Sequence, residues 1–412
     1  MADFVTSLYL TFMFIGLYMF SIFIILLVRN RPEVFSHPKP NRNFKVSVII
    51  PVHNEEDSVE ETVNHIMDLD YPEKKKEVIV VNNNSTDKTG EILKKLKKKY
   101  RNLKVVFEET PGKSNAVNAG IKIATGELMA VSDADSFPSE KSLEKLTGFF
   151  DDPKMGAVTS FVTIRNKEDN FLAKIQSIEY MLLGWNRKML DFVDSVYVTN
   201  GPLSLYRKKF VEEAGGFDPK SITEDIDITW NLMSRGYKTG ICLDARVSTI
   251  APTKFKMWFR QRTRWGMGGL QALMKYKKMF FRKGMFGIFV MPFVSFSIIM
   301  SLFTFSFSMY LLLKLLFTKF LSTGYSVTVD TALFNLQEVN FYPSALIFYF
   351  VVLFGISFVY TWYVLKITKY EENLTIKKFF NVIFYMLIYL TVYPIVWFAS
   401  IYRYATGDMK WW

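Results

Sequence analysis

Uncharged apolar runs stand at both ends of the chain. Four stretches contain no charged residue: 4–28, 285–313, 341–365 and 379–402. Each exceeds the roughly 20 apolar residues that a helix needs to cross a bilayer. A buried core helix is the alternative for each run, but the uncharged length argues against it. The pattern therefore predicts one membrane-spanning helix near the N-terminus and about three in the C-terminal part.

Basic residues beside these runs predict their orientation. Several follow the first run or separate the third from the fourth: Arg29, Arg31, Lys39, Arg42, Lys366, Lys369, Lys377 and Lys378. The loop between the second and third runs has only Lys319 in its middle. The positive-inside rule then places residues 29–284 in the cytoplasm and both termini outside, in a multi-pass protein of the cell membrane. Because no basic segment precedes the first run, we expect an uncleaved anchor rather than a signal peptide.

Short apolar runs alternate with helical segments in the middle of the chain. Runs typical of buried strands are KVSVIIP (45–51), EVIVV (77–81), KVVF (104–107) and ELMAVS (127–132), with helical periodicity over 58–67, 89–100 and 114–124. This alternation predicts a three-layered α/β fold with a mostly parallel sheet. Ligands bind at the carboxyl ends of such strands. Polar clusters follow there, at residues 53–56, 82–84 and 133–135.

The chain thus divides into five predicted parts. They are an N-terminal membrane helix (1–30), a tether containing three prolines (31–44), an α/β domain (45–250), amphipathic interfacial helices (251–284) and a C-terminal membrane region (285–412).

Charge and composition narrow the class of protein. The net charge of +12 favours anionic lipid headgroups and anionic substrates, and no nucleic-acid recognition module is visible. The single cysteine, Cys242, excludes an internal disulfide and suits a reducing compartment. His37, His53 and His65 lack metal-ligand spacing, which argues against a zinc enzyme.

The segment SDAD places Asp133 and Asp135 two residues apart after a predicted strand. An extended backbone would point both carboxylates to one side. Paired oxygens of this kind suit Mg²⁺ or Mn²⁺ when the ion also takes ligands from a diphosphate. Aspartates also favour strand-ending turns, which is the purely structural alternative.

The segment SITEDID (221–227) has two interpretations. Ser221 and Glu224 have the spacing of a capping box, and acidic residues in a first helical turn suit the helix dipole. Alternatively, Asp225 is a general base that deprotonates an attacking sugar hydroxyl. Spacing does not separate the two, and both can hold.

The segment PGKSNAVNAG (111–120) combines a turn with Lys113, Asn115 and Asn118 at a predicted helix start. A lysine and helix-start amides make an anion site, and an ordinary turn is the alternative.

The segment RQRTRWGMGG (260–269) is rich in arginine. On a helix, Gln261, Arg264 and Trp265 share one face. An interfacial helix explains the amphipathic character. A site for a charged sugar substrate is the alternative, because arginine binds phosphate with two hydrogen bonds and indole stacks on sugar. The interfacial helix does not explain the glutamine beside the arginine and the tryptophan, but the segment alone leaves both interpretations open.

Taken in order, IPVHNEE, NNNSTD, PGKSNAVNAG, DAD, NGPLSLYR, GGFD, TED and QRTRW resemble the family 2 glycosyltransferases over roughly residues 45–270. The resemblance is to the processive membrane polysaccharide synthases, most of all to poly-N-acetylglucosamine, chitooligosaccharide and hyaluronan synthases. It implies a GT-A (nucleotide-diphospho-sugar transferase) domain inserted between transmembrane helices. The implied reaction is inverting transfer of an N-acetylglucosamine-type sugar from a UDP-sugar to a growing β-linked polymer that is exported across the membrane.

The resemblance also implies residue roles. Asp225 would be the catalytic base beside Glu224, and Asp135 would hold Mg²⁺ or Mn²⁺. The implied nucleotide-sugar ligands are Pro51, Asn54, Glu55, Asn82, Asn83, Lys113, Asn115, Asp133, Asp135 and Arg264. The implied acceptor ligands are Asn200, Gly201, Gln261 and Trp265, with Pro202 beside them.

One position departs from the family pattern, because Asn82 and Asn83 stand where an aspartate pair is usual. The position is expected to read the nucleobase, so the identity of the donor is open there. Four spans make a thin channel for a polymer, and an accessory subunit or a homo-oligomer would widen it. Transfer of a single sugar to a lipid-linked acceptor and a non-catalytic membrane scaffold are the alternatives. The intact DAD, TED and QRTRW segments argue against the scaffold.

Overall fold

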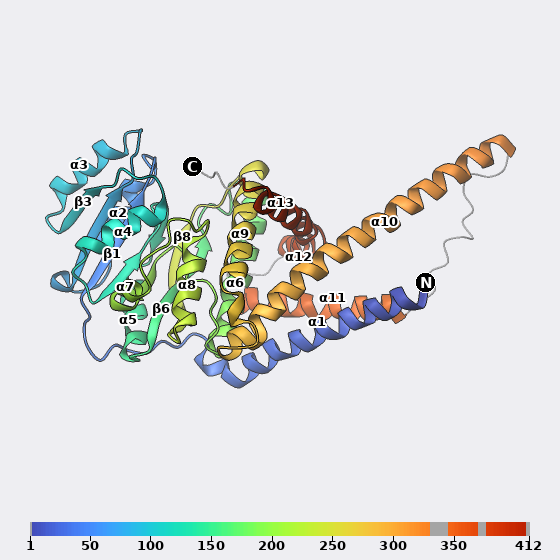
Figure 1. Cartoon of the computed structure of the whole chain (residues 1–412), viewed down its shortest axis with the longest axis horizontal. Coiled ribbons are helices and arrows are strands. Elements are labelled where there is room, and N and C mark those ends of the chain that lie inside the picture. The colour runs from blue at the N-terminus through green and yellow to red at the C-terminus, as the bar shows by residue number, and fades with distance from the viewer. Residues whose placement is uncertain (1, 330–344, 370–375, 409–412) are drawn as a thin grey trace.

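The computed structural model describes residues 2–329, 345–369 and 376–408. Its α/β part and its long apolar helices lie at opposite ends of the molecule (Figure 1). The strands are β1 (Val46–Val52), β2 (Lys76–Asn82), β3 (Leu103–Phe107), β4 (Leu128–Val131), β5 (Ser136–Pro138), β6 (Met155–Ile164), β7 (Ser204–Arg207) and β8 (Lys238–Thr249). The predicted strands β1 to β4 are therefore confirmed.

The helices of the α/β part are α2 (Val59–Met67), α3 (Thr89–Lys99), α4 (Lys113–Ile123), α5 (Ser142–Thr147), α6 (Phe171–Asp191), α7 (Lys208–Glu213), α8 (Glu224–Ser234) and α9 (Phe255–Lys275). The apolar helices are α1 (Ala2–Asn30), α10 (Met291–Val329), α11 (Ala345–Ile367), α12 (Ile376–Phe384) and α13 (Tyr393–Thr406). Short 3₁₀ and π turns connect several of them, and the π turn η7 (Tyr385–Tyr389) and the 3₁₀ turn η8 (Leu390–Val392) join α12 to α13.

All eight strands form one sheet in the order β3-β2-β1-β4-β7-β6-β8-β5. The first four are parallel, as predicted, but β7 pairs antiparallel with both β4 and β6, and β5 pairs antiparallel with β8. The expectation of a mostly parallel sheet is therefore wrong for the second half, which is mixed. Strands β6 and β8 still run parallel.

Helices cover both faces of the sheet. In β1, Val48 and Ile50 face one core with α2 and α3, whereas Ile49 faces a second core with α4 and α8. Successive strand residues point to opposite faces, so a nearly continuous apolar strand is what two buried faces require. The predicted three layers are confirmed.

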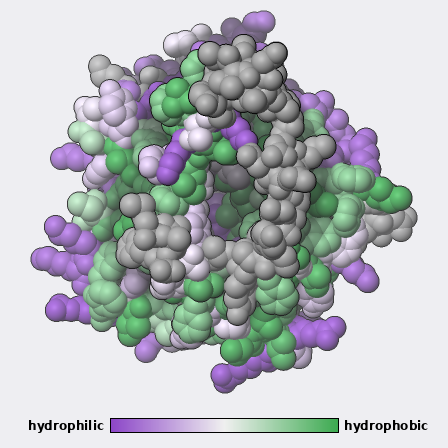
Figure 2. Space-filling view, turned by 90° about the vertical axis from the view of Figure 1, so that its right-hand side faces the viewer, coloured by the Kyte–Doolittle hydropathy of each residue, from purple (hydrophilic) through white to green (hydrophobic). Residues whose placement is uncertain are grey.

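Among the described residues, four helices are long and apolar enough to cross a membrane: Thr6–Glu33, Phe286–Leu321, Phe350–Ile367 and Ile376–Thr406. They match the four predicted runs, although residues 341–344 of the third run lie outside the described residues. The last helix is broken at residues 385–392 by η7 and η8. Seen from the side of the far ends of these helices, the molecule shows many hydrophobic residues toward the middle of the view, and most of the hydrophilic residues in view lie near its rim (Figure 2).

Helices α6 and α9 join the α/β part to the apolar helices. Ile178 and Trp185 of α6 pack in one core with Trp258 of α9 and Val364 of α11. Helix α13 lies against α9, where the Ser400 hydroxyl donates to the Thr263 carbonyl at 3.1 Å. This frame places the α/β sheet edge, α6 and α9 around a single cavity.

Candidate active site

A cavity of about 760 Å³ lies between the carboxyl ends of β1 and β4, the start of α4, and helices α6 and α9. It gathers most of the residues that the sequence singled out: Pro51, Glu55, Asn83, Lys113, Asn115, Asp133, Asp135, Asn200, Gly201, Glu224, Asp225, Gln261, Arg264 and Trp265. Segments far apart in sequence therefore meet at the predicted sheet edge. Asn54 and Asn82 are not among the lining residues.

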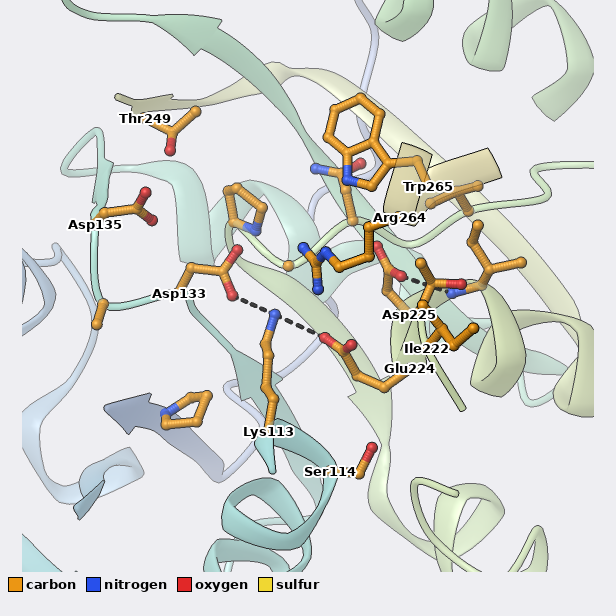
Figure 3. A pocket seen from close by; sticks show the side chains of 18 of the residues that line it. Lys113, Ser114, Asp133, Asp135, Ile222, Glu224, Asp225, Thr249, Arg264 and Trp265 are labelled. Atoms are coloured by element: carbon orange, nitrogen blue, oxygen red, sulfur yellow. Dashed lines mark hydrogen bonds and ion pairs between the residues drawn. The ribbon is translucent and has the colours of Figure 1, made fainter. Parts of the chain in front are cut away.

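Lys113 bridges two of the predicted acidic residues. Its Nζ lies 2.5 Å from Asp133 Oδ1 and 2.7 Å from Glu224 Oε1 (Figure 3). Burial by itself would raise the pKa of Glu224, but the Lys113 ammonium outweighs it and holds that pKa below its usual range. Lys113 is also the first residue of α4, whose N-cap Gly112 has φ +128°. An ammonium at a helix start that faces the cavity favours an anionic ligand.

The TED segment starts helix α8 without a capping box. The N-cap is Thr223 rather than Ser221, and its side chain makes no capping hydrogen bond. The capping-box interpretation is therefore wrong, because the Glu224 carboxylate pairs with Lys113 instead of turning back to the helix start. The Thr223 hydroxyl is buried at the cavity wall with no hydrogen-bond partner in the described structure.

Asp225 has the properties of a base that works near neutral pH. Burial and the neighbouring Glu224 carboxylate raise its pKa from 3.8 to about 6. One of its oxygens, Oδ1, accepts a hydrogen bond from the Ile226 backbone at 2.9 Å. A carboxylate with a raised pKa is a stronger base than an ordinary aspartate, yet it is still mostly ionised at pH 7.

Asp133 and Asp135 line the same cavity, in the short connection between β4 and β5, where Ala134 and Asp135 form a turn. Burial, Asp133 and Glu55 raise the pKa of Asp135 to about 7. Within the described residues, no ion pair joins Asp135 to a cationic side chain. Crowded carboxylate oxygens with this excess of negative charge fit a hard divalent cation such as Mg²⁺ or Mn²⁺. The described residues contain no group of three or more His, Cys, Asp or Glu side chains that could hold a metal ion, so such an ion would need ligands from a diphosphate as well.

Gly201 lies against the Asp133 carboxylate. A Cβ atom at this position would overlap both Asp133 oxygens. We therefore expect Gly201→Ala to displace Asp133 from Lys113 and to lower turnover by roughly 10²-fold, a loss of the size that a misplaced catalytic constellation causes. Steady-state kinetics measures the turnover, and thermal unfolding measures the stability of the variant. Gly215 has open space around it but a φ of +91°. Gly215→Ala therefore shows the effect of backbone strain without a side-chain overlap. Equal losses in both variants would contradict the predicted contact.

Residues 47–215 match the family model described as glycosyl transferase family 2. This segment is a family 2 glycosyltransferase domain. Over 247 residues the chain is 33% identical to the probable glycosyltransferase YdaM of Bacillus subtilis, covering 58% of both chains. Over 232 residues it is 34% identical to the poly-beta-1,6-N-acetyl-D-glucosamine synthase of Staphylococcus aureus, covering 56% of both. The chain thus spans little more than half the length of these relatives.

The fold of the glycosyltransferase domain resembles a solved structure. The mannosyltransferase PcManGT from Pyrobaculum calidifontis, in complex with GDP-Man and Mn²⁺, aligns with a TM-score of 0.50 and 23% identity. The alignment covers 63% of this chain and 72% of that one. The predicted GT-A-type α/β fold is thereby confirmed.

The asparagines at the end of β2 support a loop of the glycosyltransferase domain. The Asn83 amide donates to the carbonyls of Glu108 and Thr110 and accepts from the Gly112 backbone at 2.8 Å. The Asn82 side-chain oxygen, Oδ1, accepts from the Ser85 backbone at 3.1 Å. Asn83 thus shapes the segment before α4, and Asn82 shapes the loop after β2. The contact of either amide with a nucleobase stays a prediction.

Asn54, like Asn82 and Asn83, holds a loop at the carboxyl ends of the strands. Its φ of +53° is in the left-handed region, which asparagine tolerates better than most residues. Its side-chain oxygen accepts from the Thr86 backbone at 2.8 Å. Asn54 therefore ties the loop after β1 to the loop after β2, and its predicted role as a ligand stays untested.

Helix α6 brings residues to the cavity that the sequence reasoning missed. Tyr180 and Arg187 line the cavity, as does Tyr197 beyond the end of the helix, and the centroid of the Tyr180 ring lies 6.2 Å from that of Trp265. Arg187 donates to the Asn200 side-chain oxygen at 2.8 Å, whereas Arg187 Nε and Asn200 Nδ2 are buried without a described hydrogen-bond partner. Two unsatisfied donors in a cavity wall suit a hydroxylated ligand. No sequence signal singled out Arg187, because its neighbours Asn186 and Lys188 are also polar.

Proposed function

We propose that this chain is an inverting, processive β-glycosyltransferase that polymerises an N-acetylglucosamine-type sugar from a UDP-sugar and exports the polymer across the cell membrane. The observation that carries the proposal is the single cavity that joins Asp225, Lys113 and Asp135 to Gln261, Arg264 and Trp265 beside the apolar helices. The name of the Staphylococcus aureus relative supports the sugar class.

The proposed reaction is one displacement. A hydroxyl oxygen of the acceptor attacks C1 of the donor sugar while Asp225 takes the hydroxyl proton. The bond between C1 and the phosphate oxygen breaks, and UDP leaves with the bonding electron pair. Attack from the side opposite to UDP converts an α-linked donor into a β-linked product.

The cations of the cavity stabilise the departing diphosphate. Lys113 and Arg264 lie on the cavity wall near the acidic residues, and both act on the Asp225 and Glu224 carboxylates through space. A guanidinium and an ammonium aimed at developing phosphate charge lower the barrier without reorganising during the step. A divalent cation held by Asp135 would supply further charge stabilisation for the leaving group.

The acceptor end lies at α9 and α6. Trp265 offers an aromatic surface for a sugar ring, and Gln261 and Asn200 offer amide groups to its hydroxyls. The apolar helices next to this end would provide the route through the bilayer, with the domain in the cytoplasm. An accessory subunit or a second copy is compatible with the proposal.

Turnover with a panel of donors tests the proposal. The purified chain in lipid nanodiscs receives UDP-sugars with Mg²⁺ or Mn²⁺, UDP release is measured, and products are sized on a gel. A metal-dependent ladder made from UDP-N-acetylglucosamine supports a processive synthase. Single additions to an extracted lipid would replace it with a lipid-directed transferase. No release with any donor would refute the proposed activity for the chain by itself.

A further inference from the structure

A buried ion pair lies directly behind the acceptor end of the cavity. Arg262 of α9 is 2% exposed and Glu179 of α6 is 4% exposed, with Nη2 of Arg262 2.5 Å from Oε2 of Glu179. Neither residue is among those that line the cavity. Removing two charges from water is costly unless further hydrogen bonds satisfy them, so the surroundings of this pair indicate what it does.

Arg262 contacts three residues that do line the cavity. Its Nη1 donates to the Gln261 side-chain oxygen at 2.5 Å. Its guanidinium carbon lies 4.1 Å from the centroid of the Trp265 ring and 5.7 Å from that of Tyr180. A planar guanidinium over an indole restrains the ring and leaves the opposite face for another partner. Arg262 therefore holds the side chains that would receive the acceptor sugar.

The last apolar segment completes the network. The hydroxyls of Tyr389 and Tyr393 both donate to the Glu179 carboxylate. Arg262 Nε donates to the Tyr393 hydroxyl at 3.2 Å, and Trp258 Nε1 donates to the Tyr389 hydroxyl at 2.6 Å. These tyrosines flank η8, where the helix between α12 and α13 is broken. A fully satisfied buried network of this kind fixes one geometry.

We propose that Arg262 is a positioning residue through which the segment 376–406 sets the geometry of the acceptor platform, defined as Tyr180, Gln261 and Trp265. This inference rests on the proposed function for its chemistry. Donor binding is expected to be separate, because Lys113 starts α4 and Asp135 follows β4, away from the tyrosines. Arg264, the third donor ligand of the proposed function, makes no described contact with Arg262, Tyr389 or Tyr393. Loss of the network would thus weaken acceptor use and leave nucleotide affinity intact.

Conservative variants test the inference without removing a charge. Tyr393→Phe removes one hydroxyl from the network, and Arg262→Lys keeps the charge but loses the planar fork. The control is Tyr360→Phe, which removes a tyrosine hydroxyl that bonds outside the network: it accepts from Trp185 Nε1 at 3.0 Å and joins α11 to α6. Tyr360 makes no described contact with Arg262.

The first readout needs no turnover. The chain is labelled with 5-fluorotryptophan, and Trp265→Phe assigns the Trp265 signal in the ¹⁹F NMR spectrum. We expect Tyr393→Phe and Arg262→Lys to shift or broaden that signal, and Tyr360→Phe to leave it in place. An unchanged Trp265 signal in both network variants would overturn the positioning role.

The second readout is kinetic and uses a β-1,6-linked N-acetylglucosamine tetrasaccharide as acceptor. Tyr393→Phe should raise the acceptor KM roughly tenfold, the effect of one lost hydrogen bond to a charged group. The Kd for UDP should change less than about twofold, and kcat at saturating acceptor should stay near the wild-type value. Equal losses of UDP and acceptor binding would mean a merely structural role. If wild type transfers no sugar while the Trp265 signal responds, the proposed function fails and the positioning role stands.

Discussion

Asp225→Asn is expected to lower glycosyl transfer by about 10²–10⁴-fold, the range that a general base contributes. The amide keeps the shape of the side chain but cannot accept the hydroxyl proton. UDP binding should survive, because Lys113 and Asp135 are unchanged. Turnover assays and calorimetric titration with UDP measure the two effects separately.

Asp227→Asn is the matched control for this variant. Asp227 stands on the same helix but accepts from Lys275 Nζ at 2.7 Å and from the Tyr276 hydroxyl at 3.2 Å. It does not line the cavity. The same substitution there should cost stability and leave turnover within a few-fold. Comparable loss of turnover in both variants would contradict the assignment of Asp225 as the base.

The pH dependence of wild type gives an independent check on Asp225. Its pKa of about 6 means that it is protonated and inactive below that pH and ionised above it. The rate should therefore fall as the pH drops through about 6, when metal is saturating so that Asp135 stays ionised. The residual activity of Asp225→Asn should lack this acidic limb. A wild-type rate that is flat down to pH 5 would exclude Asp225 as the titrating base.

Lys113→Met has the second large expected effect. Methionine keeps the unbranched side chain up to the ε position but leaves the carboxylates of Asp133 and Glu224 without the cation between them. The donor diphosphate then meets negative charge where an ammonium stood. We expect kcat/KM for the UDP-sugar to fall by roughly 10³-fold, comparable to the loss of a stabilising donor at a reaction centre.

The substitution at Lys113 should act first on donor affinity. The Kd for UDP, measured by calorimetry, is expected to rise by at least about tenfold. Lys122→Met is the control, because Lys122 is exposed on the same helix and is distant from the cavity lining. A Lys113→Met variant that binds UDP as tightly as Lys122→Met would show that the lysine neutralises protein carboxylates only.

Local patterns determined the elements of this chain and the nature of its site. Strand and helix periodicity over residues 45–132 predicted β1 to β4 and the helices between them, and uncharged length predicted four membrane spans. The helical spacing of Gln261, Arg264 and Trp265 predicted one face, and all three line the cavity. These features can be predicted from the sequence because the periodicity of side chains along a helix or a strand follows directly from its backbone geometry.

Only the tertiary structure decided how the charges pair. The acids near Lys113 also fitted a strand-ending turn and a capping box, and they became its partners because the start of α4 meets the end of β4 and the start of α8. The antiparallel insertion of β7 between β4 and β6 likewise depended on the path of the chain. Glu179, Arg262 and Tyr393 meet from three helices that the sequence places far apart. Contacts between residues so far apart in sequence depend on how the helices pack against one another. The periodicity within a single helix carries no information about that packing.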